Sequence, residues 1–227
     1  MTTYLITGAN RGIGLGLAKH AIEQGYTVIG TARNPEQADE LRSLGAQVEA
    51  LETDSRASVE QLAQRLGDAS IDVLVNNAGI FPHECDDIND FDPEAYERVM
   101  RVNTLGPILL TQALIPNLER SERKLAVQVT SNLGSITDAS KGQMGFLGYR
   151  VSKAALNMAN ATMAHQLKAK SITTVALHPG WVRTDLGGEN GDLSIDEATS
   201  SIMSTIESLK PTDTGRYVDY KGDELPW

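Results

Sequence analysis

Short apolar runs alternate with longer amphipathic stretches along the 227-residue chain. Compact apolar runs are typical of buried strands, and apolar residues spaced three and four apart are typical of helices. The predicted strands cover residues 3–7, 27–32, 47–51, 71–75, 125–130 and 172–177. The predicted helices cover residues 12–24, 35–44, 55–66, 93–118 and 149–167. Strict alternation of this kind predicts an α/β fold, a doubly wound parallel sheet with helices on both faces, in a single domain spanning residues 1–227.

Two helix starts are marked by residues that satisfy the first backbone N–H groups of a helix. Asp92 followed by Pro93 is a good start for the helix at residues 93–118. Ser194 and Glu197 have the spacing of a capping box and open a last helix. An apolar pair at residues 217–218 then predicts a short final strand at the edge of the sheet.

Charge and composition exclude several function classes. The chain has 30 acidic and 20 basic residues, which gives a net charge of −10. Nucleic acids and anionic membranes bind basic surfaces, so neither is expected as a partner. Cys85 is the lone cysteine, so no internal disulfide forms, and neither a secretory signal nor a membrane span is predicted. We therefore expect a cytoplasmic protein, and the four histidines share no metal-ligand spacing, so no metal site is predicted.

The first predicted strand runs directly into a glycine-rich turn. Glycines allow a tight turn and a close approach to a ligand, and the N-terminus of the following helix suits a pyrophosphate. The spacing is Gly-x3-Gly-x-Gly rather than the Gly-x-Gly-x-x-Gly of the common dinucleotide fingerprint. Its place after the first strand of an alternating chain still predicts a dinucleotide site. The residues predicted to bind there are Gly8, Asn10, Arg11, Gly12, Ile13 and Gly14.

The end of the second predicted strand indicates which dinucleotide binds. An acidic residue there would bind the ribose 2′-hydroxyl of NAD, whereas this chain has Arg33. A guanidinium can bind a 2′-phosphate through two hydrogen bonds, and Arg11 is placed to bind it from the other side. NADPH/NADP+ is therefore predicted over NADH. Asp54, just past the third strand, either accepts a hydrogen bond from the adenine amine or caps the next helix.

Tyr149 and Lys153 lie four residues apart at the start of a predicted long helix, so they share one helix face. A free tyrosine has a pKa of about 10 and is a poor proton donor or base at neutral pH. A nearby positive charge stabilises the phenolate and lowers that pKa. The pair therefore predicts a site at which a tyrosine exchanges a proton.

With the glycine turn, this pair resembles the short-chain dehydrogenase/reductase family. Other motifs of that family follow in order: Asn-Asn-Ala-Gly at residues 76–79, Asn103, Thr130-Ser131, Pro179-Gly180 and Thr184. The resemblance covers nearly the whole chain and implies a Rossmann-like fold. Residues 177–188 and the ending Leu-Pro-Trp are similar to the carbonyl-reductase-like group that includes Sniffer and the C-factor proteins.

The resemblance implies a catalytic tetrad of Asn103, Ser131, Tyr149 and Lys153. In that scheme Tyr149 donates a proton to the carbonyl oxygen while Ser131 holds that oxygen by a hydrogen bond. Lys153 lowers the pKa of Tyr149 and binds the nicotinamide ribose, and Asn103 anchors a water that links Lys153 to solvent.

The same resemblance implies further cofactor contacts and a subunit arrangement. The residues concerned are Asn76, Ala78 and Gly79 on the adenosine side and Pro179, Gly180, Val182 and Thr184 around the nicotinamide. Members of the family usually pair through the long helices that begin near residues 93 and 149. A homodimer or homotetramer is therefore expected.

The identity of the catalytic serine stays open between Ser131 and Ser135, because Ser131 lies 18 residues before Tyr149, a longer interval than in many relatives, and Ser135 lies 14 before it. We favour Ser131, which directly ends a predicted strand and is therefore held more rigidly. Residues 135–147 would then belong to the rim of the substrate pocket.

Apolar residues on loops at the carboxyl ends of the strands predict an apolar carbonyl substrate. The candidates are Ile80, Phe81, Met144, Phe146 and Leu186. The favoured function is NADPH-dependent reduction of aldehydes and ketones. The alternative is a dinucleotide-binding regulatory or signalling protein of the C-factor type, in which catalysis is incidental.

Overall fold

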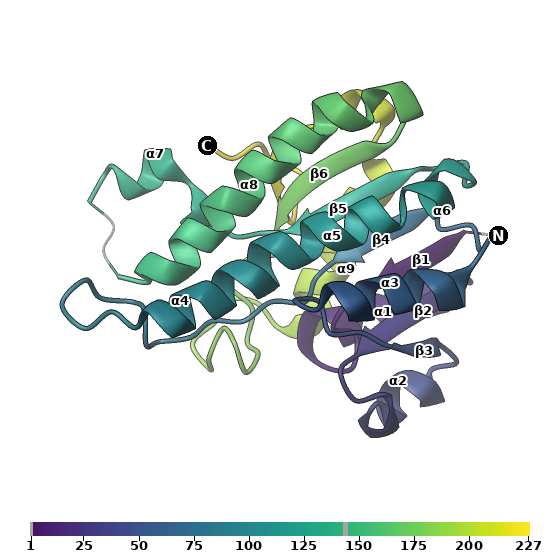
Figure 1. The fold of residues 1–227 in the computed structure, drawn as a ribbon, viewed down its shortest axis with the longest axis horizontal. Helices are drawn as coiled ribbons and strands as arrows, with labels where there is room; N and C mark the ends of the chain where they lie inside the picture. Colours follow the sequence, from purple (N-terminus) through teal and green to yellow (C-terminus); the bar gives the residue numbers. More distant parts are fainter. Residues whose placement is uncertain (1, 143–144) are drawn as a thin grey trace.

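A seven-stranded parallel sheet forms the centre of the computed structural model, which describes residues 2–142 and 145–227 (Figure 1). The strands are β1 (Thr3–Ile6), β2 (Thr27–Ala32), β3 (Gln47–Ala50), β4 (Val73–Asn76), β5 (Leu125–Val129), β6 (Thr173–His178) and β7 (Tyr217–Asp219). The main helices are α1 (Gly12–Glu23), α2 (Asp39–Ser43), α3 (Arg56–Leu66), α4 (Pro93–Met100), α5 (Gly106–Ala113), α6 (Ile115–Glu119), α7 (Ile136–Ala139), α8 (Leu147–Leu167) and α9 (Ile195–Ser208). The predicted doubly wound α/β architecture is confirmed.

Helices cover both faces of the sheet and create two cores. Side chains alternate along each strand, so neighbours such as Tyr4 and Leu5 enter opposite cores. One core packs against α1, α2 and α9, and the other packs against α3, α5 and α8. In Figure 1, α3, α5 and α8 lie on the near side of the sheet.

The strand order β3-β2-β1-β4-β5-β6-β7 reverses direction between β1 and β4. The chain builds outward from β1 to β3, then returns and builds the other half from β4 to β7. Ile6 pairs with Gly30 on one side and Val75 on the other, so the carboxyl ends of these strands meet. Open parallel sheets bind ligands outside the carboxyl ends at such a reversal.

The helix predicted at residues 93–118 forms as four segments: α4, a π-helical turn, α5 and α6. Asp92 caps α4 by accepting from the N–H of Glu94, as its position before Pro93 predicts. A π-helical turn at Arg101–Leu105 then separates α4 from α5. Pro107 lacks an N–H, and its ring would clash with a carbonyl four residues back, so the wider turn before it relieves that crowding.

The predicted starts of the last helix and of the edge strand are confirmed, whereas the helix predicted at residues 35–44 is divided in the structure. The capping box of Ser194 and Glu197 opens α9, and residues 217–219 form the edge strand β7. The helix predicted at residues 35–44 divides into a 3-10 turn at Pro35–Gln37 and the short α2, with Ala38 between them. None of the helices in the described part of the chain combines the length and apolar character needed to cross a bilayer.

Candidate active site

A cleft of about 580 Å³ lies at the carboxyl ends of the strands around the reversal of strand order. On one side of β1 it is lined by the end of β2, and on the other side by segments that follow β4, β5 and β6. The predicted site residues that line it are Gly8, Asn10, Arg11, Gly12, Ile13, Arg33, Asp54, Ala78, Gly79, Tyr149, Lys153, Pro179 and Thr184. Chain segments far apart in sequence therefore meet at one ligand-sized site.

The glycine turn has the geometry of an anion site. Gly8 and Gly12 have φ values of 62° and 56°, a region that glycine enters without steric cost. At Gly14 a Cβ would lie 2.3 Å from the carbonyl oxygen of Gly8, so only glycine lets α1 start this close to the turn. Within the described residues no side chain caps α1, and its first turn contains no acidic residue. The first N–H groups of α1 are therefore available to an anionic ligand, which fits a dinucleotide phosphate.

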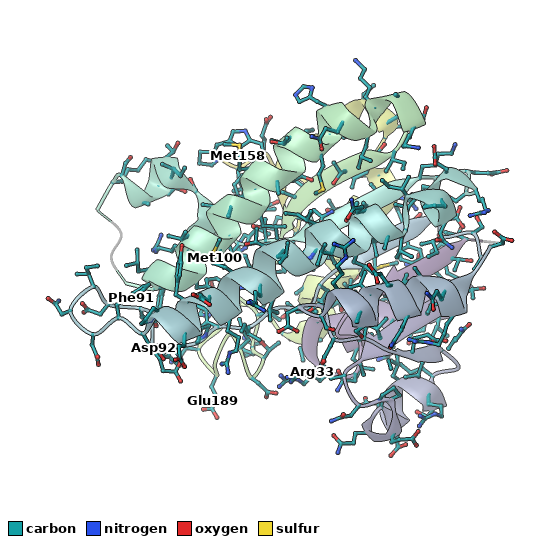
Figure 2. All side chains as sticks on the ribbon, in the orientation of Figure 1. Arg33, Phe91, Asp92, Met100, Met158 and Glu189 are labelled. Atoms are coloured by element: carbon teal, nitrogen blue, oxygen red, sulfur yellow. The ribbon has the colours of Figure 1, made fainter. Side chains whose placement is uncertain are left out.

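Arg11, Arg33 and Arg98 line the cleft. Arg33 is exposed, and within the described part of the chain its side chain makes no hydrogen bond or ion pair (Figure 2). Arg11 forms an exposed ion pair with Asp185, which lies on the segment after β6. Arg98, on α4, adds a cation that the sequence analysis missed, because a helical arginine carries no motif. The cleft thus gathers guanidinium groups on a chain whose net charge is −10.

Asp54 lines the cleft, and the neighbouring Ser55 caps α3. The Ser55 hydroxyl accepts from the N–H of Ser58 at 3.3 Å. The alternative that Asp54 caps this helix is therefore wrong, and Asp54 lines the cleft near the end of β3.

Asn76 lies in a buried polar network rather than on the cleft wall. Its side-chain amide donates to Thr111 Oγ1 at 3.1 Å and to Gln128 Oε1 at 2.9 Å. Asn77 lines the cleft instead, and its amide donates to the Thr7 carbonyl at 2.8 Å. Side chains alternate between faces at a strand end, so the predicted wall position of Asn76 was shifted by one residue.

Gly180 and Val182 lie behind the lining that Pro179 and Thr184 provide. Gly180 has a φ of 85°, and a Cβ there would lie 2.6 Å from Leu193 Cδ1. Val182 is buried and bridges to Leu193. These two residues shape the segment after β6, and their contact with the nicotinamide stays a prediction.

Tyr149 and Lys153 lie one turn apart near the start of α8, as the sequence predicts. Both are buried, with 7% and 4% of their surfaces exposed. The Lys153 ammonium donates to the Val129 carbonyl at 2.9 Å and lies 5.6 Å from the centre of the Tyr149 ring. The carbonyl at the end of β5 therefore fixes the ammonium beside the phenol.

Burial controls the ionisation of both groups. It raises the pKa of Tyr149 to about 12, although a hydrogen bond with Ser131 acts in the opposite direction. It lowers the pKa of Lys153 to about 8. The expectation that the ammonium lowers the pKa of Tyr149 is not met without a cofactor, because desolvation of the phenolate dominates. Tyr149 is therefore a protonated phenol at neutral pH.

Ser131 and Ser135 occupy different environments. Ser131 follows β5, and its Oγ accepts from the N–H of Leu133 at 3.1 Å. The same hydroxyl donates to Asn132 Oδ1 at 3.4 Å, a long contact that Tyr149 or a ligand can replace. Ser135 caps α7 by accepting from the N–H of Asp138 at 3.0 Å, and it donates to the main-chain oxygen of Trp227. The geometry brings Ser131 rather than Ser135 to Tyr149.

Asn103 joins the π-helical turn to the loop after β4. Its amide accepts from the Ile80 N–H and donates to the Ile80 carbonyl, both at 2.9 Å, and donates to Ser152 Oγ at 3.1 Å. A Cβ at Gly79 would lie 3.3 Å from Asn103 Oδ1 and 3.7 Å from Lys153 Nζ. Asn103 is fully buried and holds this loop beside Lys153.

Aromatic and aliphatic side chains form the rim around Tyr149. The Phe81 ring centre lies 4.5 Å from that of Tyr149 and 5.1 Å from that of Phe146. Ile80 and Leu186 line the cleft, whereas Met144 lies outside the described residues. The side of the cleft next to the phenol is therefore apolar.

Comparisons with known proteins agree with this architecture. Residues 2–193 match the family described as short chain dehydrogenase. The C-signal of Myxococcus xanthus is 40% identical over 157 residues, which cover 69% of this chain and 93% of that relative. The NADPH-bound carbonyl reductase from chicken fatty liver matches with a TM-score of 0.92 and 32% identity, over 100% of this chain and 99% of the other. Carbonyl reductase Sniffer of D. melanogaster matches over 100% of both chains, with a TM-score of 0.93 and 33% identity. The chain belongs to the short-chain dehydrogenase family.

Proposed function

We propose that the protein reduces aldehyde or ketone carbonyls to alcohols with NADPH. The observation that carries the proposal is the protonated, buried phenol of Tyr149, which has the hydroxyl of Ser131 beside it. Tyr149 lines the cleft that also contains the anion-binding glycine turn, and Ser131 follows Thr130, which lines the same cleft. A phenol that keeps its proton suits reduction, because the product alcohol must receive a proton on oxygen.

The roles of the four polar residues follow from their contacts. Tyr149 donates its proton to the carbonyl oxygen, and Ser131 donates a hydrogen bond to the same oxygen as negative charge develops there. Lys153, fixed by Val129, holds positive charge close to the phenolate that remains. Asn103 keeps the loop after β4 in place, and it stays our candidate anchor for a water that returns a proton through Lys153. The bound cofactor supplies the hydride that reaches the carbonyl carbon.

NADPH is the proposed cofactor because cations, rather than a carboxylate, follow β2. Arg33 has no competing partner among the described residues and is free to bind a 2′-phosphate. Arg11 would exchange Asp185 for that phosphate. The NADPH-bound state of the similar chicken reductase supports the same choice.

An apolar carbonyl compound is the proposed substrate class. The rings of Phe81 and Phe146 next to Tyr149 favour apolar and aromatic groups beside the reacting carbon. We also propose that subunits pair through the long helices that begin near residues 93 and 149. On the second of these, α8, Val151 and Met158 are exposed, and Met158 is labelled in Figure 2. Light scattering that gives the mass of a single 24.5 kDa chain would contradict this pairing.

The first test measures NADPH consumption by the purified protein with aldehydes, ketones and diketones, together with the variant Tyr149→Phe. We expect turnover by the native protein and a loss of about 100-fold or more in the variant, since general acids contribute ~10²–10⁴-fold. The variant should bind NADPH normally by fluorescence titration. Equal turnover by the two proteins would overturn the role of Tyr149.

A dinucleotide-binding signalling protein remains the second candidate, because of the similarity to the C-signal. Tight NADPH binding without turnover of any carbonyl compound would favour it. The buried Tyr149, Lys153 and Ser131 argue for the enzyme, since a binding module has no need to bury an ammonium at a substrate cleft.

A further inference from the structure

Tyr217, on the edge strand β7, contacts the main chain of Ser131. Its side chain is fully buried, and its hydroxyl donates to the Ser131 carbonyl at 2.6 Å. Short contacts of this kind are strong hydrogen bonds for a hydroxyl donor. A residue outside the catalytic motifs thus contacts the peptide that carries the candidate catalytic serine.

The turn after Ser131 is held from the opposite side by α8. The Asn157 amide, one turn beyond Lys153, accepts from Thr130 Oγ1 at 2.7 Å and donates to the Gly134 carbonyl at 3.4 Å. A Cβ at Gly134 would lie 2.8 Å from the Lys153 carbonyl carbon, so the turn is pressed against the helix. The Ser131 peptide therefore lies between α8 and β7.

Tyr217 also connects this peptide to the rim of the pocket. Its ring packs on the ring of Trp227, with a centre-to-centre distance of 5.3 Å. The main-chain oxygen of Trp227 accepts from the N–H of Thr137 at 2.7 Å and from the Ser135 hydroxyl at 3.3 Å. One buried tyrosine thus supports both the serine and the loop that follows it.

We propose that Tyr217 is a positioning residue for the reduction. Its hydroxyl fixes the Ser131 peptide, so that the Ser131 hydroxyl stays beside the Tyr149 phenol and the substrate oxygen. This inference rests on the proposed function, in which Ser131 binds that oxygen. The Ser131 carbonyl also accepts from the N–H of Gly134 at 2.9 Å, so loss of the tyrosine hydroxyl leaves the carbonyl paired and the fold intact.

The test compares Tyr217→Phe with the matched variant Tyr4→Phe. Both remove one hydroxyl from a fully buried tyrosine, but the Tyr4 hydroxyl donates to Glu207, at the opposite end of the sheet. We expect Tyr217→Phe to lower kcat about tenfold, less than the ~100-fold that a 1 Å misplacement can cause. The KM for NADPH should stay within about twofold. Tyr4→Phe should keep the native kcat, while both variants melt at slightly lower temperatures.

A double-mutant cycle separates positioning from general weakening of the fold. Tyr217→Phe introduced into Ser131→Ala should change kcat less than about twofold, because the group that it positions is already gone. A tenfold loss in that background, or equal kcat for Tyr217→Phe and Tyr4→Phe, would overturn the inference while the reductase stands. A native protein that reduces no carbonyl compound would instead refute the proposed function and the inference that rests on it.

Discussion

The two sides of the cleft differ in how their polar groups are held. On the catalytic side, Asn103, Ser131 and Lys153 are at most 7% exposed, and each is hydrogen-bonded to backbone groups. On the adenosine side, Arg33 is exposed, and Arg11 pairs with Asp185 in an ion pair whose side chains are 66% and 79% exposed. The proposed catalytic side is thus held by buried hydrogen bonds, whereas the proposed adenosine side presents exposed cations.

This difference follows from the work that each side does. The proton donor must be placed accurately relative to the reacting carbonyl, because a misplacement of about 1 Å can cost about 100-fold in rate. The groups that bind the carbonyl are therefore held in position before the substrate binds. A phosphate attracts guanidinium groups from water, and exposed ion pairs are weak enough to exchange. We therefore expect substitutions on the catalytic side to alter kcat and stability, and substitutions on the adenosine side to alter cofactor affinity alone.

The two serines provide the largest expected contrast. Ser131→Ala removes a proposed donor to the substrate oxygen and should lower kcat by roughly 10²–10³-fold, as the loss of one oxyanion donor does. Ser135→Ala removes the cap of the four-residue helix α7 and should leave kcat within about threefold. Steady-state kinetics with one aldehyde and saturating NADPH measures both. If Ser135→Ala alone abolishes turnover, the assignment of Ser131 is wrong.

Lys153→Met should stabilise the fold while it inactivates the enzyme. Lowering the pKa of a lysine from 10.5 to about 8 by burial corresponds to ~3 kcal/mol of destabilisation. The lost hydrogen bond to Val129 offsets about 1 kcal/mol, which leaves a net gain of about 2 kcal/mol in unfolding free energy. Urea unfolding at pH 7 measures the gain, and Lys170→Met, at an exposed lysine paired with Glu119, is the control.

The pH dependence of that gain identifies its cause. Below about pH 8 the Lys153 ammonium is charged in the folded and unfolded states, so the penalty of burial is complete. Between pH 8 and about 10.5, Lys153 is deprotonated in the folded protein but still protonated in the unfolded chain. The unfolded chain therefore binds more protons, and the native protein gains stability as the pH rises. The advantage of Lys153→Met should therefore shrink across this range. An advantage that stays constant would show that better packing, rather than a buried charge, produces it.

The fold was predictable because each strand and helix carries a local signal. The apolar runs, the Asp92 cap and the Ser194 capping box appear in the structure where the sequence predicts them. The π-helical turn at Arg101–Leu105 was not predictable, because it depends on how the helix accommodates Pro107 within the packed fold. Local residues thus predict the elements, and the packing of the chain decides how the helix is divided.

The site residues were predictable where the motif residue itself faces the cleft. They were less predictable where the residue next to it in sequence lines the cleft instead. Asn77 lines the cleft, whereas the Asn76 side chain points into the buried network with Gln128. Which of the two faces the cleft depends on the direction of the side chains at the end of β4, and a sequence motif does not encode this. The contacts of Val129 with Lys153 and of Tyr217 with Ser131 join residues distant in sequence, and they involve backbone carbonyls that carry no residue-type signal. Side chains that act on substrate leave a sequence signal, whereas the contacts that position them appear only in the folded chain.

Arg33→Asp tests the adenosine side and has the smallest expected effect. It removes a proposed partner of the 2′-phosphate and introduces a carboxylate that can accept from a ribose 2′-hydroxyl. The Kd for NADPH should rise about tenfold or more, since one charge-assisted hydrogen bond contributes ~1.5–3 kcal/mol, while the Kd for NADH falls. Urea unfolding should be unchanged, because Arg33 is exposed and unpaired among the described residues.

The control for charge is Arg56→Asp. Arg56 lies at the start of α3 and pairs with Glu60, and the substitution changes the net charge of the chain by the same amount. Raised salt should increase the Kd of the native protein for NADPH toward the Kd of Arg33→Asp, because salt screens exposed charges. If Arg56→Asp weakens NADPH binding equally, net charge rather than a directed contact determines the preference. If Arg33→Asp destabilises the fold, the contrast between a buried catalytic side and an exposed adenosine side is lost.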